Sequence, residues 1–136
     1  MFVLLSIKVH AQDLTQHQWE NRLIILLCHD PGDVGVKKQL NEFRHFAAGL
    51  QERKVLVYQV TPERFKQGWD NPNKWKKSDH LFSKYKSDGS DFELLLIGLD
   101  GGIKLREKEP ISCEKIFRLI DSMPMRRREM EQNQGN

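Results

Sequence analysis

The hydrophobic pattern is strongest between residues 91 and 106, where two apolar runs flank a glycine-rich turn. Residues 92–97 carry apolar side chains at five of six positions, and residues 103–106 alternate apolar and charged side chains. Between them, Asp100 and Gly101 supply the pair of positive-φ positions that a tight turn needs. The pattern predicts a β-hairpin whose second strand has one solvated face and lies at a sheet margin.

A second continuous apolar run, residues 22–28, shows no alternation, so we expect a strand buried on both faces in the centre of a sheet. From Val36 to Leu50 apolar residues recur at spacings of four and three, which predicts an amphipathic helix reaching about Arg53. Residues 54–60 form another apolar run that is rich in β-branched side chains. A strand, a helix and a second buried strand predict a right-handed βαβ unit with parallel strands.

The remaining predicted elements are short. Residues 61–68 begin with Thr-Pro-Glu, which predicts a short helix that ends at Gly68, and residues 69–77 are expected to form a loop. A further short helix is predicted to carry Leu81, Phe82 and Tyr85. A last helix is predicted over residues 112–123, with a serine cap at its start and Pro124 ending it.

In chain order these elements read β-α-β-α-β-β-α, with a parallel first half and an antiparallel second half. This is the order of a thioredoxin-like domain, so we expect one α/β domain with a mixed central sheet flanked by helices. The domain is expected over residues 12–130, with a polar tail at residues 131–136. A chain of 136 residues can bury such a core without disulfides or metal ions.

Net charge and hydropathy bear on whether the protein binds nucleic acid or spans a membrane. The chain has 22 Lys and Arg against 19 Asp and Glu, a net charge of +3, so composition does not favour a nucleic-acid partner. No apolar run approaches the length of a membrane span. The oligomeric state does not follow from the sequence.

The first eleven residues allow two interpretations. Residues 2–7 are apolar, and Val9-His10-Ala11 places small or apolar residues where a signal peptidase would cut, after Ala11. They are then the remnant of a signal peptide that starts upstream, and the protein is periplasmic or secreted. Alternatively they form an apolar first strand, and the protein is cytoplasmic. We favour export.

Two segments resemble the prokaryotic branch of the DUDES family, a domain of unknown function. They are residues 94–106, LLLIGLDGGIKLR, followed by Pro110 and an amphipathic helix, and residues 121–130, DSMPMRRREM. Trp-Glu-Asn-Arg at residues 19–22 is similar to a motif of the same family. The resemblance covers residues 19–130. It implies a thioredoxin-like, peroxiredoxin-related fold, as in secreted proteins such as equarin and the sushi-repeat-containing proteins, and it implies no established activity.

Thiol chemistry is the first activity to weigh for this fold class. Dithiol exchange needs two cysteines close together at the first strand-to-helix junction, and this chain has only Cys28 there, with Asp30 and Asp33 nearby. The alternative is a single-cysteine peroxidase or reductase that uses Cys28. We favour Cys28 and Cys113 as buried packing residues. A disulfide between them depends on geometry and stays open.

Metal and cofactor chemistry find no support in the sequence. Five histidines are scattered without ligand spacing, at positions 10, 17, 29, 45 and 80. A polar turn is the simpler explanation for His29-Asp30 with Asp33 than a hard-ion or acid/base site. We therefore predict no metal and no cofactor.

Basic and aromatic residues interleave between residues 62 and 86, and three arginines follow Pro124. Such patterns bind anions, nucleic acid strands or glycan-rich partners, although aromatics that fix a solvated loop to the core give the same pattern. The candidate binding surface consists of Trp69, Trp75, Lys76, Arg126 and Arg127. The sequence thus favours a non-catalytic binding or adaptor module for a protein or anionic ligand, with the Cys28 enzyme as the alternative.

Overall fold

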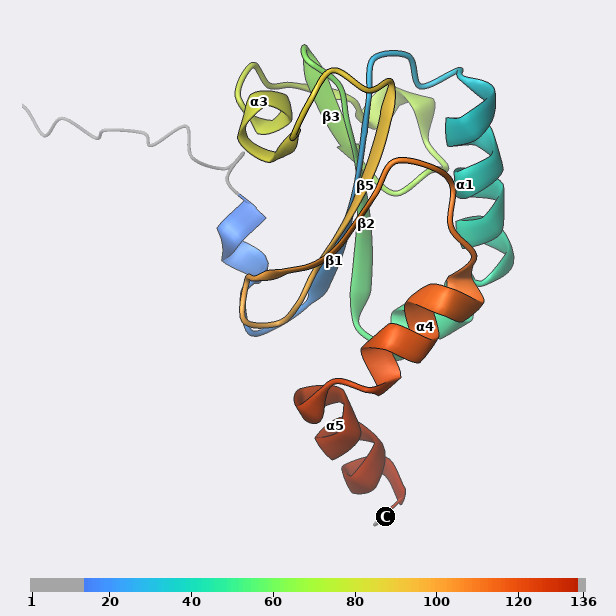
Figure 1. Cartoon of the computed structure of the whole chain (residues 1–136), viewed down its shortest axis with the longest axis vertical. Helices are drawn as coiled ribbons and strands as arrows, with labels where there is room; N and C mark the ends of the chain where they lie inside the picture. The colour runs from blue at the N-terminus through green and yellow to red at the C-terminus, as the bar shows by residue number, and fades with distance from the viewer. Residues whose placement is uncertain (1–13, 135–136) are drawn as a thin grey trace, which may run out of the picture.

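The computed structural model describes residues 14–134, which form a six-stranded sheet with helices on both faces (Figure 1). The strand order across the sheet is β4-β3-β2-β1-β5-β6. The strands are β1 (Arg22–Cys28), β2 (Val55–Val60), β3 (Arg64–Gln67), β4 (Lys76–Lys77), β5 (Phe92–Ile97) and β6 (Ile103–Glu107). This is the expected mixed α/β architecture, and it is consistent with a single thioredoxin-like domain.

β1 is the central strand, as its unbroken apolar run predicted. It pairs in parallel with β2 and antiparallel with β5, and all seven of its residues are buried. Because side chains alternate along a strand, Ile24 and Leu26 face one side of the sheet while Ile25 and Leu27 face the other. The sheet therefore needs a covering layer on each face.

One face is covered by three helices and the other by shorter segments (Figure 1). On the first face lie α1 (Val34–His45), α2 (Ala47–Glu52) and α4 (Cys113–Asp121). On the second lie the 3₁₀ turn η1 (Leu14–His17) and α3 (Leu81–Tyr85), which contribute Leu14 and Leu81 to the core. No helix among residues 14–134 is long and apolar enough to cross a membrane.

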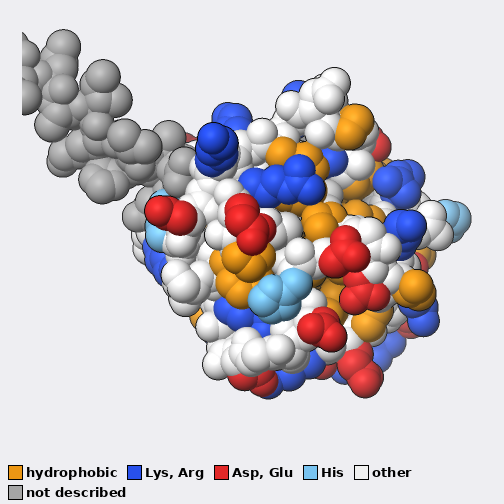
Figure 2. All heavy atoms as spheres, turned by 90° about the horizontal axis from the view of Figure 1, so that it is seen from above, with side chains coloured by type: hydrophobic (Ala, Val, Ile, Leu, Met, Phe, Trp, Pro, Cys, Tyr) orange, Lys and Arg blue, Asp and Glu red, His pale blue; other side chains and the backbone are white. Residues whose placement is uncertain are grey.

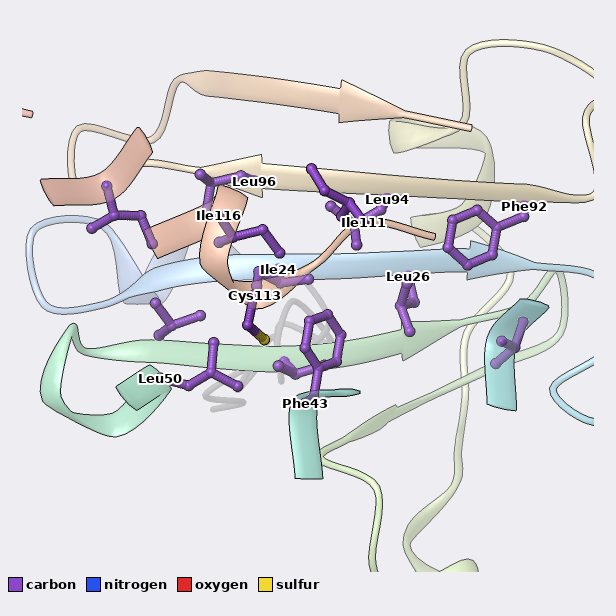
Figure 3. Packing of buried hydrophobic residues seen from close by; sticks show 14 of the residues in the cluster. Ile24, Leu26, Phe43, Leu50, Phe92, Leu94, Leu96, Ile111, Cys113 and Ile116 are labelled. Atoms are coloured by element: carbon purple, nitrogen blue, oxygen red, sulfur yellow. The ribbon is translucent and has the colours of Figure 1, made fainter. Parts of the chain in front are cut away.

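The larger core lies between the sheet and the first helical layer (Figure 3). Phe43 from α1, Leu50 from α2 and Ile116 from α4 point onto the strands, where they meet Ile24 and Leu96. These side chains are fully or almost fully buried, and each one removes enough apolar area from water to contribute about 1.5–3 kcal/mol. The spacing of four and three along α1 and α4 places their apolar residues on this one face.

The predicted hairpin is present as β5 and β6. In its turn, Asp100 Oδ1 accepts a hydrogen bond from Gly102 N at 2.9 Å, and Gly101 has a φ of 84°. A side chain at position 101 would be strained in this conformation. Gly101 therefore adopts the predicted positive φ, but Asp100 does not, and the turn closes between Gly98 and Gly102 instead of as a two-residue Asp-Gly turn.

Glu93 is the exception inside the apolar run of β5. Its side chain is fully buried, and its carboxylate accepts hydrogen bonds from Ser87 N and Oγ and from Arg106 Nη1 at 2.5–2.8 Å. Burial alone would raise the pKa of Glu93, but these donors hold it below its ordinary value. The pair joins β6 to the segment that follows α3.

The helix predicted over residues 61–68 is wrong, because residues 64–67 form strand β3. Thr61 N donates to the carbonyl of Arg64, and Arg64 N donates back to Thr61 Oγ1, so the chain turns back on itself. β3 then pairs antiparallel with β2 and buries Phe65. The following expected loop contains a 3₁₀ turn, η2 (Pro72–Lys74), and the two-residue strand β4.

Two other boundaries differ from the prediction. The single helix expected to reach Arg53 breaks at Phe46, which has a φ of −110° and a ψ of 27° and separates α1 from α2. Pro124 ends α4 as expected, but it also opens another helix, α5 (Pro124–Gln134). A proline is well suited to the first helical position because its missing N–H needs no partner there. The expected signal peptide lies on residues 1–11, outside the described part of the chain.

α5 is attached through Arg126, the one buried residue of this helix. The Arg126 side chain is 2% exposed, and its guanidinium lies 3.1 Å from an Asp121 oxygen, 3.2 Å from one of Glu52 and 3.3 Å from one of Glu129. Three acidic partners compensate for the loss of water around this charge. Arg126 is therefore an internal anchor that lies away from the solvent.

The start of β1 joins the same network. Arg22 is 1% exposed and lies 3.2 Å from Glu129, while Arg53 binds Asp121 at 2.9 Å. The Nε atom of Arg22 is buried without a hydrogen-bond partner among the described residues. The motif at residues 19–22, which ends in Arg22, thus lies beside the motif at residues 121–130, which contains Arg126. Their charged residues hold α5 against the domain.

We expect Arg126→Met to lower the free energy of unfolding by about 1.5–3 kcal/mol, because it removes the charge-assisted hydrogen bonds that join α5 to Glu52 and Asp121. The neighbouring Arg127 is exposed, so Arg127→Met should change stability by no more than about 0.5 kcal/mol. Urea denaturation of both variants measures the difference. Equal stability of the two variants would contradict this role for Arg126.

Candidate functional site

Cys28 occupies the first strand-to-helix junction, the position weighed for thiol chemistry. It is the last residue of β1, lies opposite Phe92 of β5 in the register, and is fully buried. Burial raises the pKa of Cys28 to about 12, and the charges of Asp30 and Asp33 act in the same direction. His29 is exposed and packs its ring against Phe82, with the ring centroids 5.0 Å apart. Cys28 is thus held as a neutral thiol in the core.

Cys113 is a second buried thiol, at the start of α4. Its backbone N–H donates to Glu42 at 2.8 Å, and its sulfur packs in the larger core (Figure 3). Burial and the Glu42 carboxylate raise the pKa of Cys113 to about 12, although Arg53 acts in the opposite direction. Both cysteines are free thiols. Neither environment stabilises a reactive thiolate.

The sequence led us to expect no metal site, and the relevant side chains are those of His, Cys, Asp and Glu. Within residues 14–134, no group of three or more His, Cys, Asp or Glu side chains could hold a metal ion. His10 lies outside this range.

Trp75 and Lys76 lie at the edge of the sheet formed by β3 and β4. The guanidinium of Arg64 lies over the Trp75 ring, 4.3 Å from its centroid, and Lys66 Nζ lies 5.5 Å from the same ring. Lys76 pairs with Phe65 across the two strands. We call Arg64, Lys66, Trp75 and Lys76 the cationic edge. β3 positions the first two residues, since Arg64 and Lys66 alternate with Phe65 and share one face.

The cationic edge has a marked excess of positive charge. Residues 64–77 contain five Lys and Arg and one Asp, a net charge of +4, whereas the whole chain carries +3. Arg64 also stands opposite Lys77 in the register of β3 and β4, and like charges directly opposite each other destabilise a sheet. Asp70 is exposed and lies 4.0 Å from Arg44 of α1. The positive potential at this edge therefore remains incompletely balanced.

Lys66 is the least compensated charge in this region. It is 6% exposed, and within residues 14–134 no carboxylate oxygen comes within ion-pair distance of its ammonium. Desolvation lowers its pKa; Asp70 opposes this shift, and the charges of Arg44 and Arg64 add to it. A mostly buried lysine whose ammonium feels the charges of two arginines is an arrangement that a bound anion would stabilise.

A cavity of about 650 Å³ adjoins the cationic edge. It is lined by Lys66, Trp75 and Lys76 together with residues of η1, β2, β3 and η2. We call this cavity the edge pocket. Figure 2 looks onto the uppermost end of Figure 1 and shows basic side chains lying beside hydrophobic surface, with acidic side chains gathered nearby.

The other predicted surface residues lie elsewhere. Trp69 is half-buried and packs against Phe43, with the ring centroids 6.3 Å apart, so it belongs partly to the core. Arg126 is buried, and Arg127 lies on α5, at the opposite end of the molecule from β3 (Figure 1). Only Trp75 and Lys76 are brought together among the five predicted residues.

The sequence placed Arg64 and Lys66 in a basic and aromatic segment without singling them out as site residues, and it did not associate Arg44 with them. The alternation Arg64-Phe65-Lys66 is a strand signal that was available, but the preceding Thr-Pro pair favoured a helix. Arg44 comes from α1, and no local pattern could place it beside β3.

A comparison with family models matches most of the chain. A family model described as a domain of unknown function, DUF4174, matches residues 13–129, so the chain belongs to this family. No curated protein matches the chain. The DUF4174 match does not establish the resemblance to the DUDES family.

We expect Cys28 in the Cys113→Ala variant to resist alkylation by iodoacetamide in the folded state. With a pKa of about 12, the thiolate fraction at pH 8 is about one part in ten thousand, and burial excludes the reagent. Labelling followed by mass spectrometry should be at least about a hundredfold slower than in denaturant. Rapid labelling of folded protein below pH 7 would show that Cys28 is a stabilised thiolate.

Proposed function

We propose that this member of the DUF4174 family is a non-catalytic binding module that holds an anionic ligand at the cationic edge. One observation carries the proposal, namely that Lys66, a residue only 6% exposed, has no carboxylate oxygen within ion-pair distance among residues 14–134. Three other charged side chains in the described structure, Arg22, Glu93 and Arg126, are also buried, and each has an oppositely charged partner within 4.0 Å. Lys66 differs from them, and an anion would supply its missing partner.

The neighbouring side chains fit this role. Arg64 is exposed and held over Trp75, so its guanidinium is positioned while its N–H donors can reach a ligand. Phosphate, sulfate and carboxylate groups accept hydrogen bonds from such donors in charge-assisted pairs. The ligand is expected to bind through an anionic group shared between Arg64 and Lys66.

Thiol peroxidase chemistry is not part of the proposal, because Cys28 is buried and lacks a cation that would stabilise its thiolate. We also propose that the module works in the periplasm or outside the cell. The apolar residues 2–7 and the small residue before position 12 support export.

The first test of the proposed function is the affinity for methyl phosphate, measured by isothermal titration calorimetry at low ionic strength. We expect Arg64→Gln to weaken binding by about tenfold or more, since it removes a charge-assisted hydrogen bond. Arg127→Gln removes the same charge from an exposed site on α5 and is expected to leave the affinity within about twofold. Equal effects of the two variants would mean that only the overall charge matters.

Lys66→Met provides the second test, because binding and stability should change in opposite directions. We expect this variant to lose methyl phosphate binding and to gain roughly 0.5–2 kcal/mol in free energy of unfolding, as at other sites where function requires a strained charge. Urea denaturation with and without methyl phosphate measures both effects. A destabilised variant that still binds would contradict the role of Lys66.

The pH dependence gives a matching expectation. The pKa of Lys66 in the folded state lies below its ordinary value of 10.5, so its charged form weakens the fold below the lowered pKa. The stability gained by Lys66→Met should therefore shrink as the pH rises through that pKa towards 10.5. Anion binding by the wild type should decline over the same range, because the ammonium loses its proton.

A further inference from the structure

The edge pocket has two chemically different parts, and its floor is apolar. Leu14 from η1, Tyr58 from β2 and Phe65 from β3 line the floor, and the rings of Tyr58 and Phe65 lie 6.4 Å apart. The hydroxyl group of Tyr58 is already engaged, at 2.7 Å from His17 Nε2 and 3.4 Å from Gln67 Oε1. All three floor residues are buried, with 2–7% exposure, so the floor is apolar but presents little surface, and the half-buried Trp75 is the ring of this pocket most open to a ligand.

The rim of the same pocket is positively charged. Lys66, Lys74 and Lys76 line it, together with the half-buried Trp75 and the amide side chains of Gln16, Gln67 and Asn73. No Asp or Glu contributes to the lining of this pocket. An anion held at the rim would consequently touch no carboxylate of the lining, although the charge of Asp70 reaches Lys66 from outside the pocket.

From this division we infer that the ligand is an amphipathic anion, with a phosphate, sulfate or carboxylate head group and a planar apolar body of ring size. The inference rests on the proposed function, since the head group is the anion held by the cationic edge. The cavity of about 650 Å³ lies in the range of small-molecule pockets, which combine an apolar lining with a few polar groups. An inorganic anion would leave the apolar floor without a contact.

The shape of the site also separates this ligand from a simple counter-ion. Water and dissolved ions are enough to balance a charge on an open surface. This pocket is lined by Tyr58 and Phe65 as well as by three lysines, so it can contact the apolar part of a ligand as well as its charge. Trp75 adds a ring that can stack with a planar body. The body of the ligand should therefore increase affinity beyond that of its head group.

The experiment compares matched pairs of probes by isothermal titration calorimetry: phenyl phosphate with methyl phosphate, and benzoate with acetate. We expect the ring to lower the Kd at least about tenfold within one of the two pairs, because stacking on Trp75 above the apolar floor removes apolar surface from water. A lower Kd for phenyl phosphate than for methyl phosphate identifies a phosphate head group, and a lower Kd for benzoate than for acetate identifies a carboxylate. A ring preference in either pair supports the inference.

Two variants test whether the ring enters the edge pocket. Asn73 and Gln16 are exposed rim residues, and Asn73→Trp or Gln16→Trp would fill the pocket without removing a cation. Each is expected to reduce the ring preference to about twofold or less while methyl phosphate still binds. Asn41→Trp, on an exposed position of α1 outside the edge pocket, is the control and should keep the full preference.

The possible failures can be told apart. If methyl phosphate and phenyl phosphate bind equally, and acetate and benzoate do as well, the inference is overturned while the proposed function stands. If both Trp variants keep the ring preference of the wild type, the ring binds elsewhere and the inference is overturned. If none of the four probes binds, the proposed function falls together with the inference.

Discussion

The burial of β1 on both faces is the constraint on which the rest of the structure depends. A strand without a solvated face needs hydrogen-bonded neighbours on both edges and an apolar layer on each side. β2 and β5 provide the edges, α1, α2 and α4 provide one layer, and η1 with α3 provides the other. At the edge formed by β3 and β4, Phe65 still packs in the second core, while Arg64 and both residues of β4 are exposed, so packing restricts the composition there less than in β1.

Buried charge is treated in two different ways in this chain. At the start of β1 and at α5, Arg22 and Arg126 are compensated by nearby carboxylates, and Glu93 is compensated by Arg106. Such ion pairs fix the positions of the elements that they join, but they add little to the free energy of unfolding, because burying the charges is costly. Lys66 has two arginines in its neighbourhood, and only the charge of Asp70 and the ring of Trp75 offset part of the free-energy cost of its burial. This contrast distinguishes the cationic edge from the structural ion pairs.

The fold class does not carry an activity by itself. The first strand-to-helix junction would suit a reactive thiol, yet here the cysteine is turned into the core, and the exposed Asp30 and the half-buried Asp33 follow it. Carboxylates at that position oppose thiolate formation. The chemistry available to this domain has therefore to be sought at the cationic edge, where cations and aromatic rings converge.

The sequence by itself determined the central strand, the hairpin of β5 and β6, and the amphipathic helices, because periodicity and turn chemistry are local properties of the chain. It did not determine β3, since pairing with β2 overrode the helix signal of Thr61-Pro62. Nor did it reveal that Arg126 is buried or that Arg44 lies near Lys66. From sequence alone a charged residue is expected to be exposed to solvent. Its burial depends on partners that are distant in the chain, and only the tertiary structure brings those partners together. The compensated network and the uncompensated edge are thus both products of long-range packing.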